Sequence, residues 1–145
     1  MIRILVVDEH PAVREGLAGI LGSDPDIRVV GEAGSAEDAL RLLPRCDPHM
    51  VSLDVRLPGM SGLDLCARLV RTRPGLRVIA LSSYSDDRTV VATFGVGAHG
   101  FFRKGSSPTL LREAVRAVAD GGTFIDPAVG APLVALATGR PANGP

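Results

Sequence analysis

The sequence predicts an α/β fold in which helices cover both faces of a parallel β-sheet. Short apolar runs, rich in Val and Ile, recur about every 25 residues, and segments with helical periodicity separate them. The runs are continuously apolar rather than alternating with polar residues, which indicates strands buried on both faces. A chain of 145 residues is long enough to form one such domain with its own core.

The apolar runs define five expected strands. They are Ile2 to Val7, Ile27 to Val30, Met50 to Leu53, Val78 to Leu81, and Gly100 to Phe102. One helical segment follows each strand. Because right-handed crossovers connect parallel strands, this strict alternation predicts a doubly wound sheet with five flanking helices.

The first two helices have clear starting signals. Pro11 suits a first helical turn and precedes an apolar stripe that extends to Leu21. The second helix is expected from Ala36 to Leu43, because apolar residues recur there at helical spacing. Ser35 is expected to act as its N-cap.

The other three helices differ in the strength of their pattern. Ser61 is expected to cap the third helix. The fourth, around Val90 and Phe94, is weak because glycines interrupt it. The fifth is the clearest, with Ser107 as its cap, Pro108 at its first position and a pair of glycines at its end.

The periodic pattern fades beyond Gly122. We expect at most a short helix from Asp126 to Ala137, because Gly130 and Pro132 weaken it. Residues 1–122 are therefore assigned to one domain, and residues 123–145 to a linker or tail.

Composition narrows the classes of function. The formal net charge is zero, with 16 basic and 16 acidic residues, so it provides no electrostatic argument for nucleic-acid or membrane binding. No apolar run approaches the roughly 18 residues of a membrane span. The N-terminus becomes acidic too early for a signal peptide, and Cys46 and Cys66 have neither metal-binding nor redox spacing. We therefore expect a cytoplasmic protein with no membrane partner.

Polar residues follow four of the expected strands. Asp8 and Glu9 follow the first, Asp54 closes the third, Ser82 follows the fourth and Lys104 follows the fifth. The carboxyl ends of parallel strands share one edge of the sheet, where sites form in such folds. Crowded carboxylates require a cation, and hard oxygen ligands suit Mg²⁺. A lysine and a hydroxyl can hold phosphoryl oxygens, so the set predicts phosphoryl transfer with Asp54 as nucleophile.

These residues also lie in recognisable motifs. The segments VVDEH, SLDVRLPGMSG, ALSS and GFFRK resemble the four signatures of a response-regulator receiver domain, over residues 1–122. The resemblance implies a flavodoxin-like, five-stranded sheet of order 2-1-3-4-5. It also implies that Asp54 accepts a phosphoryl group from a histidine kinase. Asp8 and Glu9 would hold Mg²⁺ together with Asp54 and the backbone carbonyl of Arg56.

The resemblance implies a conformational switch as well. Lys104 would pair with the phosphate, Ser82 would hydrogen-bond to it, and Phe101 would turn inward. Glu9 stands where the family usually has a second aspartate. Gly105 stands where the NarL/FixJ subfamily, which the chain also resembles, usually has Asp. None of these departures removes a required functional group.

Three further segments, HPAVREGL, GEAGS and GGTFIDPAV, resemble the NarL/FixJ (LuxR-like) subfamily and its DevR-like branch. Those proteins carry a C-terminal helix-turn-helix domain, and no pattern for such a domain occurs within residues 1–145. The resemblance implies transcription regulation through a homodimer, with DNA bound only by such an output domain. The chain is either the receiver part of a regulator or a stand-alone receiver, and both alternatives remain open.

Other functions fit the residues less well. We expect a phosphoacceptor capable of self-dephosphorylation rather than an enzyme. An aspartate-based phosphatase would need an acid at position 56, where the chain has Arg56. A nucleotide- or flavin-binding module on the same fold is a further alternative, but the G-x-G-x-x-G motif is missing after the first strand. The remaining alternative is a pseudo-receiver that acts through protein–protein contacts without phosphorylation.

Several neighbouring residues have structural explanations. His10 is expected to line the loop beside the acids rather than to act as a base. Pro58 and Gly59 shape a turn, and Gly62 is expected to let the loop pass close to the site.

Overall fold

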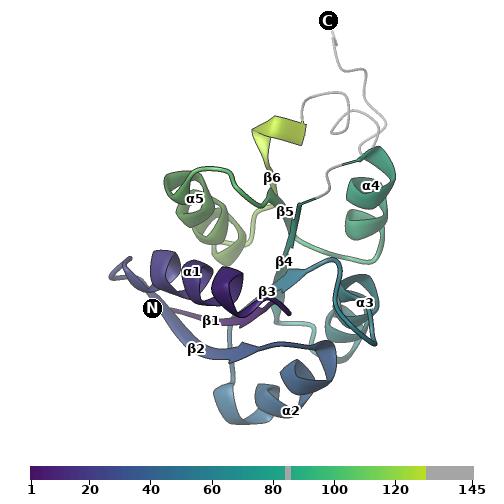
Figure 1. The fold of residues 1–145 in the computed structure, drawn as a ribbon, viewed down its shortest axis with the longest axis horizontal. Coiled ribbons are helices and arrows are strands. Elements are labelled where there is room, and N and C mark those ends of the chain that lie inside the picture. The colour runs from purple at the N-terminus through teal and green to yellow at the C-terminus, as the bar shows by residue number, and fades with distance from the viewer. Residues whose placement is uncertain (84–85, 130–145) are drawn as a thin grey trace, which may run out of the picture.

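The computed structural model describes residues 1–83 and 86–129, which form a parallel sheet with helices on both faces (Figure 1). The strand order is β2-β1-β3-β4-β5-β6. The strands are β1 (Ile2–Val7), β2 (Ile27–Ala33), β3 (Met50–Asp54), β4 (Arg77–Ser82), β5 (Gly100–Arg103) and β6 (Phe124–Ile125). The expected order of the first five strands is confirmed.

The sheet contains a sixth strand that the sequence analysis did not predict. β6 pairs in parallel with β5, where Gly100 and Phe101 oppose Phe124 and Ile125. It has two residues and follows a pair of glycines, so it produces no periodic pattern. β2 also extends to Ala33, beyond the expected end at Val30.

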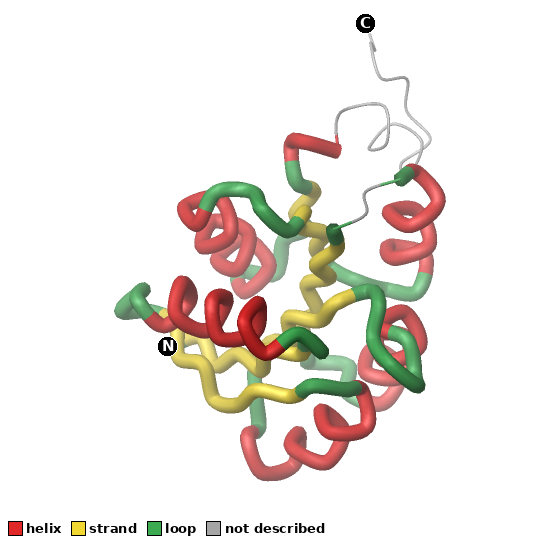
Figure 2. Tube along the Cα trace, viewed as in Figure 1, coloured by secondary structure: helices red, strands yellow, loops and turns green. Residues whose placement is uncertain are grey.

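Five α-helices follow the first five strands, as expected (Figure 2). They are α1 (Pro11–Gly22), α2 (Ala36–Cys46), α3 (Gly62–Thr72), α4 (Asp87–Gly95) and α5 (Pro108–Ala119). Ser35, Ser61 and Ser107 each accept a hydrogen bond from the backbone N–H three residues later, so the three expected caps are confirmed.

The short helix expected from Asp126 is only partly testable. A 3₁₀ helix, η1, spans Pro127–Val129. The rest of the expected segment and the tail to residue 145 lie outside the described residues. In the described part of the chain, no helix is both long enough and apolar enough to span a bilayer.

Two hydrophobic layers cover the sheet. Leu5 and Val7 of β1 pack in the layer formed with α2, α3 and α4, whereas Ile4 and Val6 pack in the layer formed with α1 and α5. Alternate strand residues therefore point to opposite faces, and both faces are buried. Because hydrophobic layers cover both faces, the polar residues that follow the strands lie at the edge of the sheet where the strands end.

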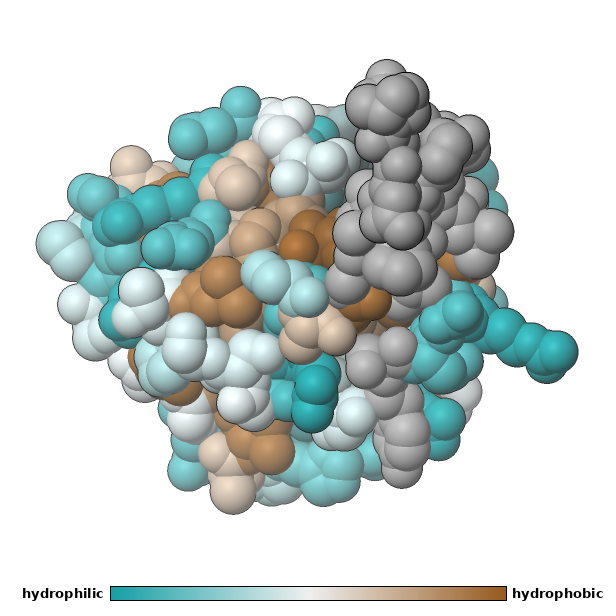
Figure 3. Space-filling view, turned by 90° about the horizontal axis from the view of Figure 1, so that it is seen from above, coloured by the Kyte–Doolittle hydropathy of each residue, from teal (hydrophilic) through white to brown (hydrophobic). Residues whose placement is uncertain are grey.

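The exterior carries hydrophobic as well as hydrophilic residues. Seen from above relative to Figure 1, hydrophobic residues reach the surface between hydrophilic ones (Figure 3). Val13 of α1 and Val91 of α4 are both 38% exposed. Single exposed apolar side chains of this kind are ordinary on a folded domain.

Candidate functional site

Three of the expected site residues meet at the carboxyl edge of the sheet. The Nζ atom of Lys104 donates hydrogen bonds to Oδ2 of Asp8 at 2.5 Å and to Oδ2 of Asp54 at 2.7 Å. The exposed fractions of these side chains are 13% for Lys104, 1% for Asp8 and 8% for Asp54. The ammonium group thus bridges two nearly buried carboxylates.

The second oxygen of each carboxylate is held by the local backbone. Oδ1 of Asp8 accepts from the N–H of His10 at 2.9 Å, and Oδ1 of Asp54 accepts from the N–H of Arg56 at 3.0 Å. Each aspartate therefore uses one oxygen for its own turn and the other for Lys104. This arrangement fixes both carboxylates before any ligand arrives.

The two bridged carboxylates and the lysine together carry a net negative charge. Asp8 and Asp54 together carry two negative charges, and Lys104 supplies one positive charge. Burial by itself would lower the pKa of Lys104, but the hydrogen bonds and charges of Asp54 and Asp8 outweigh it and raise that pKa. The lysine remains charged at neutral pH, and the cluster retains an attraction for a further cation.

A close backbone approach fixes the position of Asp54. The N–H of Gly62, at the start of α3, donates to the carbonyl of Val55 at 3.0 Å. A Cβ atom at Gly62 would lie 1.9 Å from the carbonyl oxygen of Asp54. The expectation that Gly62 lets the loop pass close to the site is confirmed, and the neighbour is the backbone of Asp54.

A pocket opens beside Asp54. Its volume is about 370 Å³, and its lining residues are Glu9, His10, Val13, Asp54, Arg56, Ser83 and Lys104. Asp8 is not among the described lining residues, so of the two bridged carboxylates Asp54 is the one that reaches the pocket. His10 was expected to line this loop, and it does.

The other expected site residues occupy different depths. The Glu9 side chain is 40% exposed, and its Oε1 lies 3.9 Å from Nε2 of His10. Ser82 is buried at the end of β4, and its carbonyl accepts from the N–H of Lys104 at 2.9 Å. Phe101 is fully buried in the layer that contains Val90 of α4. Ser82 and Phe101 are thus buried and outside the described lining of the pocket, while Glu9 and Arg56 line it.

Two residues near the site were not expected from the sequence. Ser83 lines the pocket one residue beyond Ser82. Asp126, which was assigned to the tail, is only 1% exposed. Its Oδ2 accepts from the N–H of Arg103 at 2.9 Å and from Oγ of Ser106 at 2.8 Å. These partners flank Lys104, so Asp126 ties the loop that carries the lysine to the segment after β6.

We expect Asp126→Ala to lower the free energy of unfolding by about 2 kcal/mol, because it removes the buried carboxylate that accepts several hydrogen bonds. Besides Arg103 and Ser106, the N–H of Ala128 loses its bond to Oδ1. Urea denaturation measures the change, and Asp120→Ala, at an exposed neighbouring aspartate, serves as the control. Equal losses in the two variants would contradict the tethering role.

Comparisons with known proteins place the chain among known relatives. The family model described as "Response regulator receiver domain" matches residues 4–116. The DNA-binding transcriptional activator DevR/DosR of Mycobacterium tuberculosis is 38% identical over 139 residues, which cover 96% of this chain and 64% of that protein. The chain thus spans a little less than two thirds of this relative.

Solved structures show the same architecture. The isolated receiver (REC) domain of RcsB from Salmonella enterica serovar Typhimurium, determined with the phosphomimetic BeF₃⁻, has a TM-score of 0.82 and 27% identity. The match covers 91% of this chain and 97% of that one. A structure of two RcsB dimers bound to two parallel DNAs has a TM-score of 0.83 and 26% identity, and covers 92% of this chain and 67% of that one.

Proposed function

The chain belongs to the response-regulator receiver domain family, and from this premise we propose that Asp54 accepts a phosphoryl group from a sensor histidine kinase. The observation that carries the proposal is the asymmetry of the bridged pair. Both carboxylates contact Lys104, but only Asp54 also belongs to the described lining of the pocket. An incoming phosphoryl group can therefore reach Asp54 through the pocket, while Asp8 remains behind it.

The proposed transfer is a substitution at phosphorus. A carboxylate oxygen of Asp54 attacks the phosphorus atom of a phosphohistidine, a P–O bond forms and the P–N bond breaks. The kinase imidazole leaves with the electron pair of that bond and takes up a proton. The product is an acyl phosphate on Asp54. Lys104, which contacts Asp54 Oδ2 at 2.7 Å, is close enough to pair with the phosphoryl oxygens.

The donor groups at the pocket fit a magnesium ion. Asp8 and Asp54 present hard carboxylate oxygens, and together with Lys104 they form a cluster with a net negative charge. We propose that Asp8, Glu9, Asp54 and the backbone carbonyl of Arg56 hold this ion. When bound, Mg²⁺ neutralises charge on the transferring phosphoryl group. Hydrolysis of the acyl phosphate by water from the pocket would return the domain to its resting state.

We propose that the response passes from Ser82 to β5. The Ser82 hydroxyl would hydrogen-bond to the phosphoryl group, and Phe101 would shift with it. β4 and β5 are paired so that Ala80 opposes Phe101 and Ser82 opposes Arg103, which gives the two residues a shared framework. A change at Ser82 would then alter the surface around β5 and the neighbouring helices.

The resulting surface would support a homodimer. A groove of about 460 Å³ is lined by residues of both α1 and α5, including Leu17, Ile20 and Leu111. By analogy with the DNA-binding relatives, dimerisation would control a DNA-binding output domain in the cytoplasm. A pseudo-receiver that signals without phosphate is the alternative, and phosphorylation distinguishes the two.

The test is incubation with acetyl phosphate and Mg²⁺, followed by intact-mass measurement. We expect the wild-type chain to gain one phosphoryl group, Asp54→Asn to gain none, and removal of divalent ions by a chelator to prevent the gain. Asp64→Asn, at an exposed aspartate of α3, is the matched control and should behave like wild type. Absence of incorporation in the wild-type chain would favour the pseudo-receiver.

A further inference from the structure

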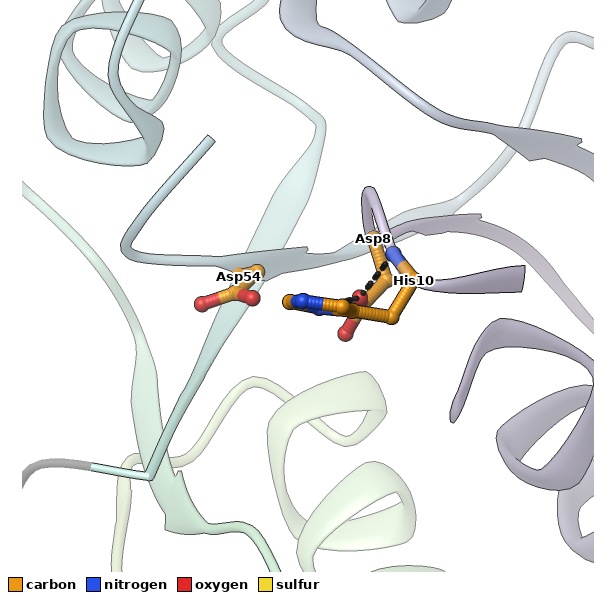
Figure 4. A group of neighbouring side chains, drawn as sticks. All are labelled: Asp8, His10 and Asp54. Carbon is orange, nitrogen blue, oxygen red and sulfur yellow. Dashed lines mark hydrogen bonds and ion pairs between the residues drawn. The ribbon is translucent and has the colours of Figure 1, made fainter. Parts of the chain in front are cut away.

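His10 joins the two aspartates in a potential metal site. Within residues 1–83 and 86–129, one ligand atom each of Asp8, His10 and Asp54 lie within 4.8 Å of one another. Figure 4 shows the imidazole of His10 extending from its loop toward the carboxylate of Asp54, beside Asp8. Nδ1 of His10 is 3.4 Å from Oδ1 of Asp8. Two ligand atoms bound to one ion at about 2.0–2.2 Å are at most about 4.4 Å apart, so a small side-chain rotation would bring the three groups onto one ion.

The loop backbone holds His10 in this position. Its N–H donates to Oδ1 of Asp8, and its carbonyl accepts the N–H of Arg14 in the first turn of α1. Pro11 follows directly and begins the helix. The imidazole itself is 63% exposed, so it can rotate toward an arriving ion without unpacking the core.

Glu9 is placed differently from His10. It lines the pocket, but in the described structure its carboxylate does not join the group formed by Asp8, His10 and Asp54. Its Oε1 lies 3.9 Å from the far nitrogen of His10, Nε2. The imidazole therefore approaches the Asp8 carboxylate with Nδ1 and the Glu9 carboxylate with Nε2.

We propose that His10 is a nitrogen ligand when a first-row transition-metal dication such as Mn²⁺ or Zn²⁺ occupies the metal site. The inference rests on the proposed function, because it assumes that Asp8 and Asp54 hold a divalent ion there. Mg²⁺ prefers oxygen ligands and retains water, whereas imidazole suits the transition metals. One site can thus use different side chains for different ions.

The other histidines provide an internal control. The chain has three, and His49 and His99 directly precede β3 and β5, at the opposite edge of the sheet from Asp54. Nδ1 of His49 accepts from the N–H of Arg3, and Nδ1 of His99 accepts from the N–H of Val78. Nitrogen coordination at the Asp54 site can therefore be assigned to His10.

The test is pulsed electron paramagnetic resonance of the full chain loaded with Mn²⁺. We expect ¹⁴N modulation from a directly bound imidazole in the wild-type chain and in His49→Gln, and its loss in His10→Gln. Calorimetric titration should show Mn²⁺ binding weakened roughly tenfold or more by His10→Gln. Mg²⁺ binding should change less than about twofold, because that ion favours oxygen.

The outcomes separate the inference from the proposed function. Mn²⁺ binding without ¹⁴N modulation in the wild type, or modulation that persists in His10→Gln, would overturn the role of His10. Mg²⁺-dependent phosphorylation of Asp54 would stand in either case. If neither ion binds and no phosphoryl group enters Asp54, both proposals are wrong. Glu9→Gln is the matched variant, and it should weaken Mg²⁺ binding more than Mn²⁺ binding.

Discussion

Gly62→Ala is expected to lower the free energy of unfolding by about 3 kcal/mol, at the upper end of the range for overpacking. The added methyl carbon would lie 1.9 Å from the carbonyl oxygen of Asp54, and 2.8 Å from both the carbonyl carbon of Asp54 and Cα of Val55. All three are backbone atoms, so no side-chain rotation can make room. Either α3 or the end of β3 must move.

The same movement should impair the site, because it displaces the backbone that carries Asp54. We expect phosphorylation of Gly62→Ala by acetyl phosphate to be much slower than that of the wild type, under conditions in which the variant is still folded. Gly19→Ala is the matched control. It also adds a methyl group to a helical glycine, but nothing lies within 4 Å of that position.

The control should change stability in the opposite direction. Replacing an unhindered glycine inside a helix by alanine typically stabilises by about 0.5–1 kcal/mol. Urea denaturation of the two variants measures both effects. Wild-type stability and phosphorylation in Gly62→Ala would show that α3 does not lie this close to Asp54.

Lys104→Met is expected to lower the free energy of unfolding by about 3 kcal/mol when no divalent ion is present. The substitution leaves Asp8 and Asp54 nearly buried, without the ammonium group that bridges them. Mg²⁺ should restore much of the loss, because it replaces the missing positive charge. Urea denaturation with and without Mg²⁺ measures both quantities.

The pH dependence of this contribution has a definite sign. Because the folded-state pKa of Lys104 is raised above its ordinary value of 10.5, the lysine stabilises the fold fully below that value. The stabilisation is lost as the pH rises through the folded-state pKa. Measurements at neutral pH therefore record the whole effect of the substitution.

A double-mutant cycle isolates the charge interaction. In Asp54→Asn the repulsion between the two carboxylates is absent, so adding Lys104→Met to that variant should cost clearly less than it does in the wild type. Equal costs in both backgrounds would show that the lysine contributes packing rather than charge.

Lys104 is also the single lysine of the chain, which otherwise uses arginine for its basic side chains. A compact ammonium suits this bridge, whereas a planar guanidinium has a different shape and hydrogen-bonding pattern.

Much of the fold follows from local patterns in the sequence. Each of the five longer strands contains an apolar run, although β2 also carries Arg28 and Glu32. Ser35, Ser61 and Ser107 mark helix starts that the structure confirms. The meeting of Asp8, Asp54 and Lys104 follows from topology, because each lies at the carboxyl end of a parallel strand. These features depend on periodicity and chain direction, which a single sequence reveals.

The missed features depend on contacts between distant segments. β6 has two residues and is defined by its pairing with β5, so nothing in its own composition identifies it. The role of Asp126 depends on Arg103 and Ser106, which are about twenty positions earlier in the chain. The nearness of His10 to Asp54 depends on the direction of one side chain after a turn. Residue order alone does not specify that direction.

The most direct test of the account is to locate the phosphoryl group chemically. Acyl phosphates are reduced by borohydride, which converts a phosphorylated aspartate to homoserine, whereas free carboxylates do not react. After treatment with acetyl phosphate and Mg²⁺, peptide mass mapping should find homoserine at position 54 and intact aspartate at position 8. Homoserine at another position, or no conversion in a chain that binds Mg²⁺, would contradict the assignment of Asp54 as the phosphoryl acceptor.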